Sequence, residues 1–204
     1  MTNERYKDIT VGILALQGSV IEHEQALARI GVRSVQVRKR EQLENIDGLI
    51  LPGGESTTLG KLLGLFGIME PLRERIRAGL PVFGTCAGLI LLAEEIEGEQ
   101  PHIGVMQMRV RRNAYGRQID SFSVRERVAE FSPQPMELVF IRAPWIERVY
   151  GEARALAELN GHIVAARQNN MLVTSFHPEL TDNGCVHAYF ADMAVAWKQT
   201  DKNK

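Results

Sequence analysis

The chain has 204 residues, of which 45% are hydrophobic and 24% are charged, and its formal net charge at pH 7 is −1. This length and composition are typical of one globular domain, and the balanced charge argues against binding to nucleic acid or to a membrane surface. Two cysteines are too few for a disulfide framework, the N-terminus is polar and no apolar run has the length of a bilayer span, so a cytoplasmic protein is expected.

The first half of the chain alternates between apolar runs and segments with helical periodicity. Strands are predicted at 9–16, 34–37, 48–51 and 81–84, and helices at 21–30, 57–65, 71–78 and 87–95. Such alternation predicts an α/β fold in which helices cover both faces of a mostly parallel sheet, a three-layer sandwich. Functional residues in these sheets gather at the carboxyl ends of the strands.

The second half changes to short strands joined by turns. These strands are predicted at 106–112, 118–124, 136–141, 163–167 and 171–175, with a hairpin turn at Asn169-Asn170. An apolar stripe predicts a last helix at 185–197. We therefore expect an antiparallel extension of the sheet, a single domain over residues 1–204, and a flexible tail over about residues 198–204.

Two adjacent glycines, Gly53 and Gly54, follow the third predicted strand. Because they lack a Cβ atom, their backbone N–H groups can approach a substrate and form an oxyanion hole. A phosphate-binding loop is poorly supported, because Leu62 stands where that motif needs Ser or Thr. A purely structural turn is the other explanation. The helix after this loop is expected to be capped by Ser56 or Thr57.

Cys86 lies between a predicted strand and a predicted helix, within the sequence Gly-Thr-Cys-Ala-Gly. This is the layout of a nucleophile elbow, with Cys in the position where serine hydrolases carry Ser. At the start of a helix, the macrodipole favours the thiolate over the thiol. The alternative is a buried cysteine in a turn that contains glycines.

His177 follows the last predicted strand, with Pro178 and Glu179 directly after it. Pro178 favours an extended conformation for His177, in which positions i and i+2 project to the same side. Glu179 is therefore expected to orient the His177 imidazole as a general base for Cys86. The alternative is a surface His-Pro turn with a solvated carboxylate. Because all three motifs follow strands, we expect them to meet at one edge of the sheet.

On these motifs the chain resembles the class I (triad-type) glutamine amidotransferases, in particular the glutaminase subunits of pyridoxal 5′-phosphate synthases. The Cys elbow marks the whole class, whereas Gly-Gly-Glu-Ser-Thr-Thr from Gly53 and Arg112-Asn113 followed by Gly116-Arg117-Gln118 single out this branch. One departure is Trp145, where His is commoner in the family, and no triad role falls there. The stretches that carry the resemblance are 14–18 with 22–23, 51–58, 84–88, 112–118, 140–144 and 175–180.

The resemblance implies the flavodoxin-like fold of this class and the hydrolysis of L-glutamine to L-glutamate and ammonia. The ammonia would pass to a separate (β/α)8-barrel synthase subunit, which makes pyridoxal 5′-phosphate (vitamin B6) from a pentose phosphate and a triose phosphate. No set of side chains has metal-ligand spacing, and neither a metal nor a cofactor is expected. Gating by the synthase is expected at the Gly53-Gly54 peptide.

The resemblance also assigns roles to residues of this chain. Cys86 would be the nucleophile, His177 the base and then the acid, and Glu179 the orienting group. The oxyanion hole would be formed by the Gly54 and Ala87 amides, and Gln17 would lie beside the site at the interface with the synthase. The residues expected to bind glutamine are Gly53, Gly54, Glu55, Arg112, Ile141 and Arg142.

Three alternatives stay open at this point. A stand-alone thiol hydrolase would keep the triad and change the substrate, and a glutaminase could serve another synthase, such as one of histidine or purine synthesis. An amidotransferase-like subunit kept only for binding is disfavoured by the intact Cys86, His177 and Glu179. Apart from the resemblance, Arg112 and Arg142 could be solvated surface charges.

Overall fold

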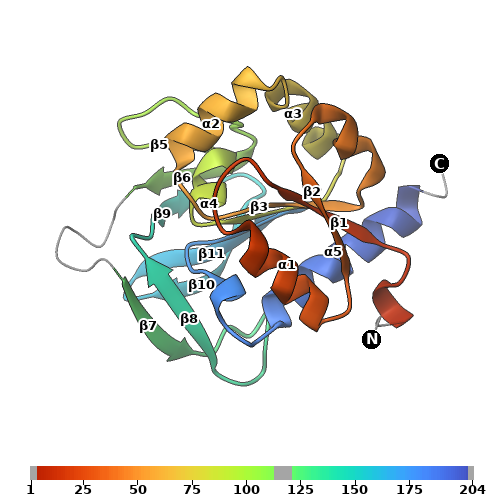
Figure 1. The fold of residues 1–204 in the computed structure, drawn as a ribbon. Helices are drawn as coiled ribbons and strands as arrows, with labels where there is room; N and C mark the ends of the chain where they lie inside the picture. The colour runs from red at the N-terminus through yellow and green to blue at the C-terminus, as the bar shows by residue number, and fades with distance from the viewer. Residues whose placement is uncertain (1–3, 113–120, 202–204) are drawn as a thin grey trace.

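The computed structural model describes residues 4–112 and 121–201 (Figure 1). The α-helices are α1 (Val20–Arg29), α2 (Ser56–Leu65), α3 (Met69–Arg77), α4 (Ala87–Leu92) and α5 (Cys185–Asp201), and the 3-10 helices are η1 (Glu4–Tyr6), η2 (Arg40–Asn45) and η3 (Pro178–Leu180). The strands are β1 (Thr10–Leu14), β2 (Arg33–Val37), β3 (Gly48–Leu51), β4 (Val82–Thr85), β5 (Ala93–Ile96), β6 (Met106–Arg111), β7 (Ser121–Glu126), β8 (Met136–Ile141), β9 (Trp145–Val149), β10 (Arg154–Leu159), β11 (His162–Gln168) and β12 (Met171–Thr174).

Within the described residues, ten strands form one sheet, in the order β2-β1-β3-β4-β12-β11-β9-β6-β5, with β10 paired to β11. The first five of these strands are parallel to one another. From β12 onward the pairing is antiparallel through β11, β9 and β6, and only β5 and β6 are parallel again. β7 and β8 form a separate antiparallel pair. The prediction of a mostly parallel sheet with an antiparallel extension is confirmed.

Helices cover both faces of this sheet (Figure 1). Along β3, the side chains of Leu49 and Leu51 pack in the core shared with α2, α3 and α4. Ile50, between them, packs in the opposite core, which α1 and α5 close. This alternation follows from the two-residue period of a strand, and burial on both faces explains why β3 has no polar side chain.

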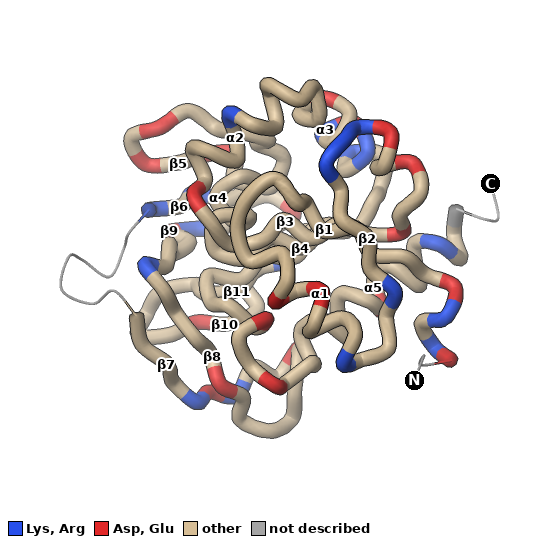
Figure 2. The backbone as a smooth tube through the Cα atoms, in the orientation of Figure 1, with Lys and Arg blue, Asp and Glu red and all other residues tan. Residues whose placement is uncertain are grey.

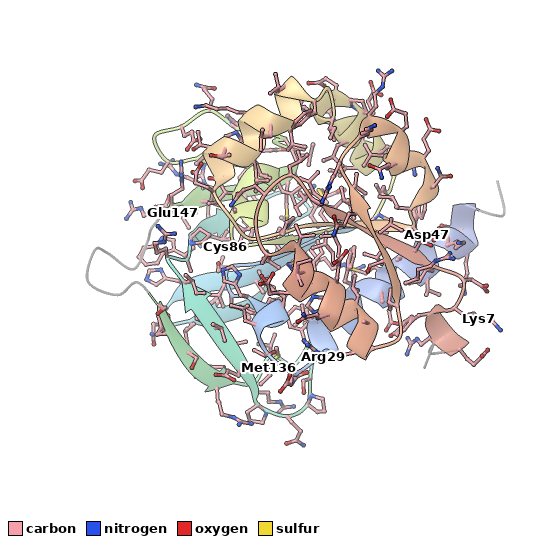
Figure 3. The ribbon with its side chains drawn as sticks, viewed as in Figure 1. Lys7, Arg29, Asp47, Cys86, Met136 and Glu147 are labelled. Carbon is pink, nitrogen blue, oxygen red and sulfur yellow. The ribbon has the colours of Figure 1, made fainter. Side chains whose placement is uncertain are left out.

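Four neighbouring strands of the parallel part place their carboxyl ends along one edge of the sheet. β1 leads there into α1, β3 into α2, β4 into α4, and β12 into η3. Figure 3 shows Cys86 at the junction of β4 and α4. This edge is therefore the place where the motifs expected to carry the chemistry meet.

The predicted helix at 87–95 is wrong in its second half. α4 ends at Leu92, and Ala93, with φ −62° and ψ 135°, starts β5 in parallel with β6. β9 and β10 were not predicted either. β9 carries a Glu147 that pairs with Arg109 on β6 at 2.8 Å, and β10 has residues that favour helices but bonds to β11. Pairing between distant strands thus overrides local preference here.

The last helix is longer than the predicted 185–197, and the flexibility of the tail at about 198–204 stays a prediction. α5 continues to Asp201, and Lys198 in its last turn donates to the carboxylate of Asp47, directly before β3, at 2.9 Å. Residues 202–204 lie outside the described residues, as do Asn113, Gly116, Arg117 and Gln118 from the stretch at 112–118.

Acidic and basic side chains are mixed along the described chain (Figure 2). On the outer face of the extension, Arg111 pairs with both Glu97 and Glu147. Within residues 4–112 and 121–201, no helix is long and apolar enough to span a bilayer.

Candidate active site

Cys86 occupies a strained turn between β4 and α4, with φ 48° and ψ −99°. A positive φ is unfavourable for a residue with a Cβ atom and persists only where the surroundings enforce it. Its backbone N–H donates to Thr174 on β12 at 2.9 Å. A Cβ atom on Gly88 would lie 2.1 Å from the Leu51 carbonyl oxygen, and one on Gly84 would lie 2.6 Å from the Gly88 backbone. The predicted elbow geometry is present, and both flanking glycines are required by packing.

His177 and Glu179 lie together, as predicted, with His177 Nδ1 2.7 Å from Glu179 Oε1. The predicted reason for this contact is wrong: the chain is not extended after His177 but turns into η3, and this 3-10 turn brings the two side chains together. The His177 ring also lies against Gly53, where a Cβ atom would be 2.4 Å from His177 Cε1. Gly53 therefore leaves the space that the imidazole occupies.

The protonation states of this pair are coupled. Burial lowers the pKa of His177, but interaction with Cys86 and Glu179 outweighs burial and raises that pKa to about 10. Burial raises the pKa of Glu179, whereas His23 and His177 lower it, with a net fall to about 2. At neutral pH this arrangement holds a carboxylate behind an imidazole that can carry a proton to and from a group beside Cys86.

The loop after β3 is held on both sides of the Gly53–Gly54 peptide. The backbone N–H of Ser19 donates to the Gly53 carbonyl at 3.0 Å, and Gln17 Oε1 accepts from the backbone N–H of Glu55 at 2.9 Å. A Cβ atom on Gly54 would lie 2.5 Å from Gln17 Oε1. The segment at 17–19 thus fixes the peptide from which the oxyanion donors are expected.

Glu55, and not Ser56 or Thr57, caps α2. Its carboxylate accepts from the backbone N–H groups of Thr57 and Thr58 at 3.3 and 2.7 Å. Hydrogen bonds from Thr58, then those from Thr57 and the charge of Arg112, outweigh burial and lower the pKa of Glu55 to about 2. Arg112 Nη2 lies 3.0 Å from Glu55 Oε1. The sequence did not predict this cap, because Glu is not one of the short polar residues that usually cap helices.

A cavity of about 560 Å³ opens over these groups. This volume is within the range of small-molecule sites. Every residue that the sequence predicted for the site lines the cavity except Glu179, which lies behind His177. The predicted residues in the wall are Gln17, Gly53, Gly54, Glu55, Cys86, Ala87, Arg112, Ile141, Arg142 and His177.

The sequence prediction missed Ser19, which also lines the cavity. Ser19 Oγ donates to Glu179 Oε1 at 2.8 Å, in addition to the contact of its N–H with Gly53. Its position directly after Gln17-Gly18, at a strand-to-helix turn of the same sheet edge, is the signal that could have identified it. The other cavity residues not predicted are Gly18, Ser56, Ile90 and Leu180.

Two further observations complete the site. Arg142 has φ 42° directly after β8, in a region that residues with a Cβ atom rarely adopt.

Within the described ranges, no three His, Cys, Asp or Glu side chains are grouped in a way that could hold a metal ion. The roles of the individual residues stay predictions.

The chain is similar to several known proteins. The model of the SNO glutamine amidotransferase family matches residues 13–196. Pyridoxal 5′-phosphate synthase subunit PdxT of Carboxydothermus hydrogenoformans is 58% identical over 89% of this chain and 96% of that protein. The PdxT of Streptomyces griseus is 55% identical over 91% of this chain and 96% of that protein. A solved glutamine amidotransferase structure aligns with a TM-score of 0.86 at 47% identity, over 90% of this chain and 98% of that one.

Proposed function

Because this chain belongs to the SNO glutamine amidotransferase family, we propose that it is the glutaminase subunit of a pyridoxal 5′-phosphate synthase in vitamin B6 biosynthesis. The name that its curated relatives carry supports the pathway. The glutaminase reaction is supported by one observation: the Cys86 elbow, the His177–Glu179 pair and the Gly53-Gly54 loop meet at the same cavity.

Glutamine hydrolysis proceeds in two acyl-transfer steps. Cys86 Sγ attacks the carboxamide carbon, and the oxygen takes up negative charge that the Gly54 and Ala87 amides stabilise. His177 then protonates the leaving nitrogen, the C–N bond breaks and ammonia departs. In the second step His177 takes a proton from water, which attacks the thioester and releases glutamate. Glu179 binds Nδ1 of His177, so that the other ring nitrogen is available for these proton transfers.

The walls of the cavity suit an amino acid. Glu55 is ionised and lies at its edge, where it can accept the α-ammonium group of glutamine. Arg142 and Arg112 bring guanidinium groups that can bind the α-carboxylate, and Arg112 also holds Glu55 in place at 3.0 Å. Ile141 contributes an apolar side chain, and its carbonyl oxygen lies 3.9 Å from Cys86 Sγ.

The partner is the (β/α)8-barrel subunit of the synthase, which receives the ammonia. Exposed apolar side chains near the cavity support docking there: Ile141 and Leu180 line it, and Ile21 lies on the outer surface of α1. Gln17 also lines the cavity, and its side chain accepts a hydrogen bond from Glu55 directly after the Gly53-Gly54 pair. The protein works as a single domain in the cytoplasm and needs no cofactor of its own.

The test is glutamate production from glutamine with increasing amounts of the barrel subunit. Wild type is expected to show a kcat that rises with the barrel subunit and a smaller change in KM, because docking would turn the Gly53-Gly54 peptide toward the oxyanion. Cys86→Ala should be inactive while folded, and Cys185→Ala is the matched control with activity retained. Activity in a folded Cys86→Ala variant would overturn the proposal, and a high rate that does not respond to the bound barrel would overturn the gating alone.

A further inference from the structure

A closed group of polar side chains lies behind the carboxylate of Glu179, on the side away from the cavity. It consists of His23 on α1, Thr85 on β4 and His187 on α5, and all three are fully buried. His23 Nδ1 lies 3.0 Å from His187 Nε2, and His23 Nε2 lies 3.2 Å from Thr85 Oγ1. The same His23 Nε2 is 3.6 Å from Glu179 Oε1. Polar groups are rarely buried without a role, because their desolvation is unfavourable unless they are well paired.

Within the part of the chain that the structure describes, the hydrogen bonds and ion pairs of the Glu179 carboxylate converge on one oxygen. Oε1 receives the Ser19 hydroxyl at 2.8 Å and His177 Nδ1 at 2.7 Å, with His23 Nε2 behind them. Oε2 is buried and has no hydrogen-bond partner within the described residues. The direction of Oε1, and with it the orientation of His177, therefore depends on the few groups that surround this oxygen.

The contact between the two buried histidines selects a tautomer. If His187 Nε2 carries its proton, His23 Nδ1 accepts, and the proton of His23 sits on Nε2, facing Thr85 and Glu179. In the opposite tautomer, a lone pair of His23 would face the carboxylate. His187 would then also bury a proton at Nδ1, which has no partner among the described residues. The first arrangement avoids both penalties.

We propose that His23 and His187 are positioning residues of the glutaminase site: His187 fixes the tautomer of His23, and the His23 N–H holds the Glu179 carboxylate toward His177. This inference rests on the proposed function. Burial lowers the pKa of His23, and burial lowers that of His187 to about 3, so both rings are neutral as the arrangement requires. Neither histidine lines the cavity, so neither acts on glutamine directly.

The first test compares His23→Asn with His23→Gln in the complex with the barrel subunit. A glutamine side chain can place an amide N–H near the position of Nε2, whereas asparagine reaches only the position of Nδ1. His23→Asn is expected to lower kcat about tenfold with KM for glutamine unchanged, and His23→Gln to recover most of that loss. His162→Asn is the matched control, since its ring stacks on Trp145 at 3.7 Å and belongs to another part of the sheet.

The second test asks whether His23 acts through Glu179. In a Glu179→Gln background, His23→Asn should lower kcat by no more than about twofold, because the carboxylate it positions is gone. Equal losses in both backgrounds, a rise in KM at constant kcat, or His23→Gln no better than His23→Asn would each overturn the inference. If His23→Asn does not fold, the same comparison is made at His187. His187→Asn is then expected to lower kcat, and His187→Gln to recover most of that loss. A wild-type complex without glutaminase activity would instead overturn the proposed function.

Discussion

The parallel part of the sheet and the antiparallel strands of the second half meet at the same cavity but supply it in different ways. These antiparallel strands, which include the separate β7–β8 pair, are called the extension below. Gly53, Cys86 and His177 follow β3, β4 and β12, and all three are buried and held by backbone or ring contacts. Arg112 and Arg142 follow β6 and β8; Arg112 is half-buried and Arg142 is exposed. The groups proposed to make and break bonds thus lie on a rigid edge, whereas the two arginines proposed to bind the α-carboxylate of the substrate directly follow strands of the extension. This division predicts that changes on the rigid edge alter kcat and stability, and that changes on the extension alter KM.

The largest effect is expected on the rigid edge, from His177→Asn. This change removes the group that moves every proton, and kcat should fall by about 1,000-fold or more. Glu179→Gln should leave more residual rate, because it disturbs orientation and leaves the imidazole in place. The measurement is glutamate release by the two variants in complex with the barrel subunit. A His177→Asn enzyme with a rate near that of wild type would show that the base lies elsewhere.

The second effect concerns the stability of the elbow. In Gly88→Ala the new Cβ atom would lie 2.1 Å from a backbone oxygen of β3, which cannot move without displacing the sheet. A loss of about 3 kcal/mol in the free energy of unfolding is expected, with loss of activity. Gly64→Ala is the matched control: the position lies in α2 with nothing within 4 Å of a Cβ atom. It should gain about 0.5–1 kcal/mol, from helix propensity alone. Urea unfolding of the two variants decides, and equal stabilities would contradict this account of the elbow.

The buried histidines should give the rigid edge a characteristic dependence on pH. Burial lowers the pKa of His187 from 6.5 to about 3, and it lowers that of His23 as well. Below pH 6.5 the unfolded chain therefore takes up protons that the folded chain does not, and stability falls as the pH decreases. The fall approaches about 1.4 kcal/mol per pH unit for His187, and His23 acts in the same direction. Glu179, with its pKa lowered from 4.5 to about 2, adds stability that is lost below pH 4.5.

His177 acts in the opposite direction. Its pKa is raised from 6.5 to about 10, so its contribution is complete below pH 6.5 and disappears as the pH rises toward 10. Stability is therefore expected to be greatest near pH 6.5. Urea unfolding between pH 5 and about pH 9 tests this. His187→Gln should flatten only the acidic side, and an unchanged acidic slope in this variant would mean that other groups produce it.

The sequence predicted the rigid edge better than the extension, for a physical reason. A central strand such as β3 has no polar side chain. The glycines around Cys86 are required by close contacts: Gly84 lies against the Gly88 backbone, and Gly88 lies against Leu51 on the neighbouring strand β3. The same reasoning cannot find β10, whose residues favour a helix and which is a strand only because β11 lies beside it. Ser19 was missed for a related reason, since its partner Glu179 is 160 residues away. Contacts of this kind are properties of the folded topology.

The smallest effect is expected on the extension, and it tests the division most sharply. Arg142→Ala should raise the KM for glutamine about tenfold with little change in kcat, because a charged contact remote from the carboxamide acts equally on the ground state and the transition state. Arg148→Ala is the control, since that arginine pairs with Glu95 at 3.1 Å on the outer face and does not line the cavity. The positive φ of Arg142 adds a second comparison: Arg142→Gly should match Arg142→Ala in KM but be more stable, because glycine relieves the strain. If Arg142→Ala lowers kcat instead of raising KM, the extension takes part in positioning the reacting groups, and the division between the rigid edge and the extension fails.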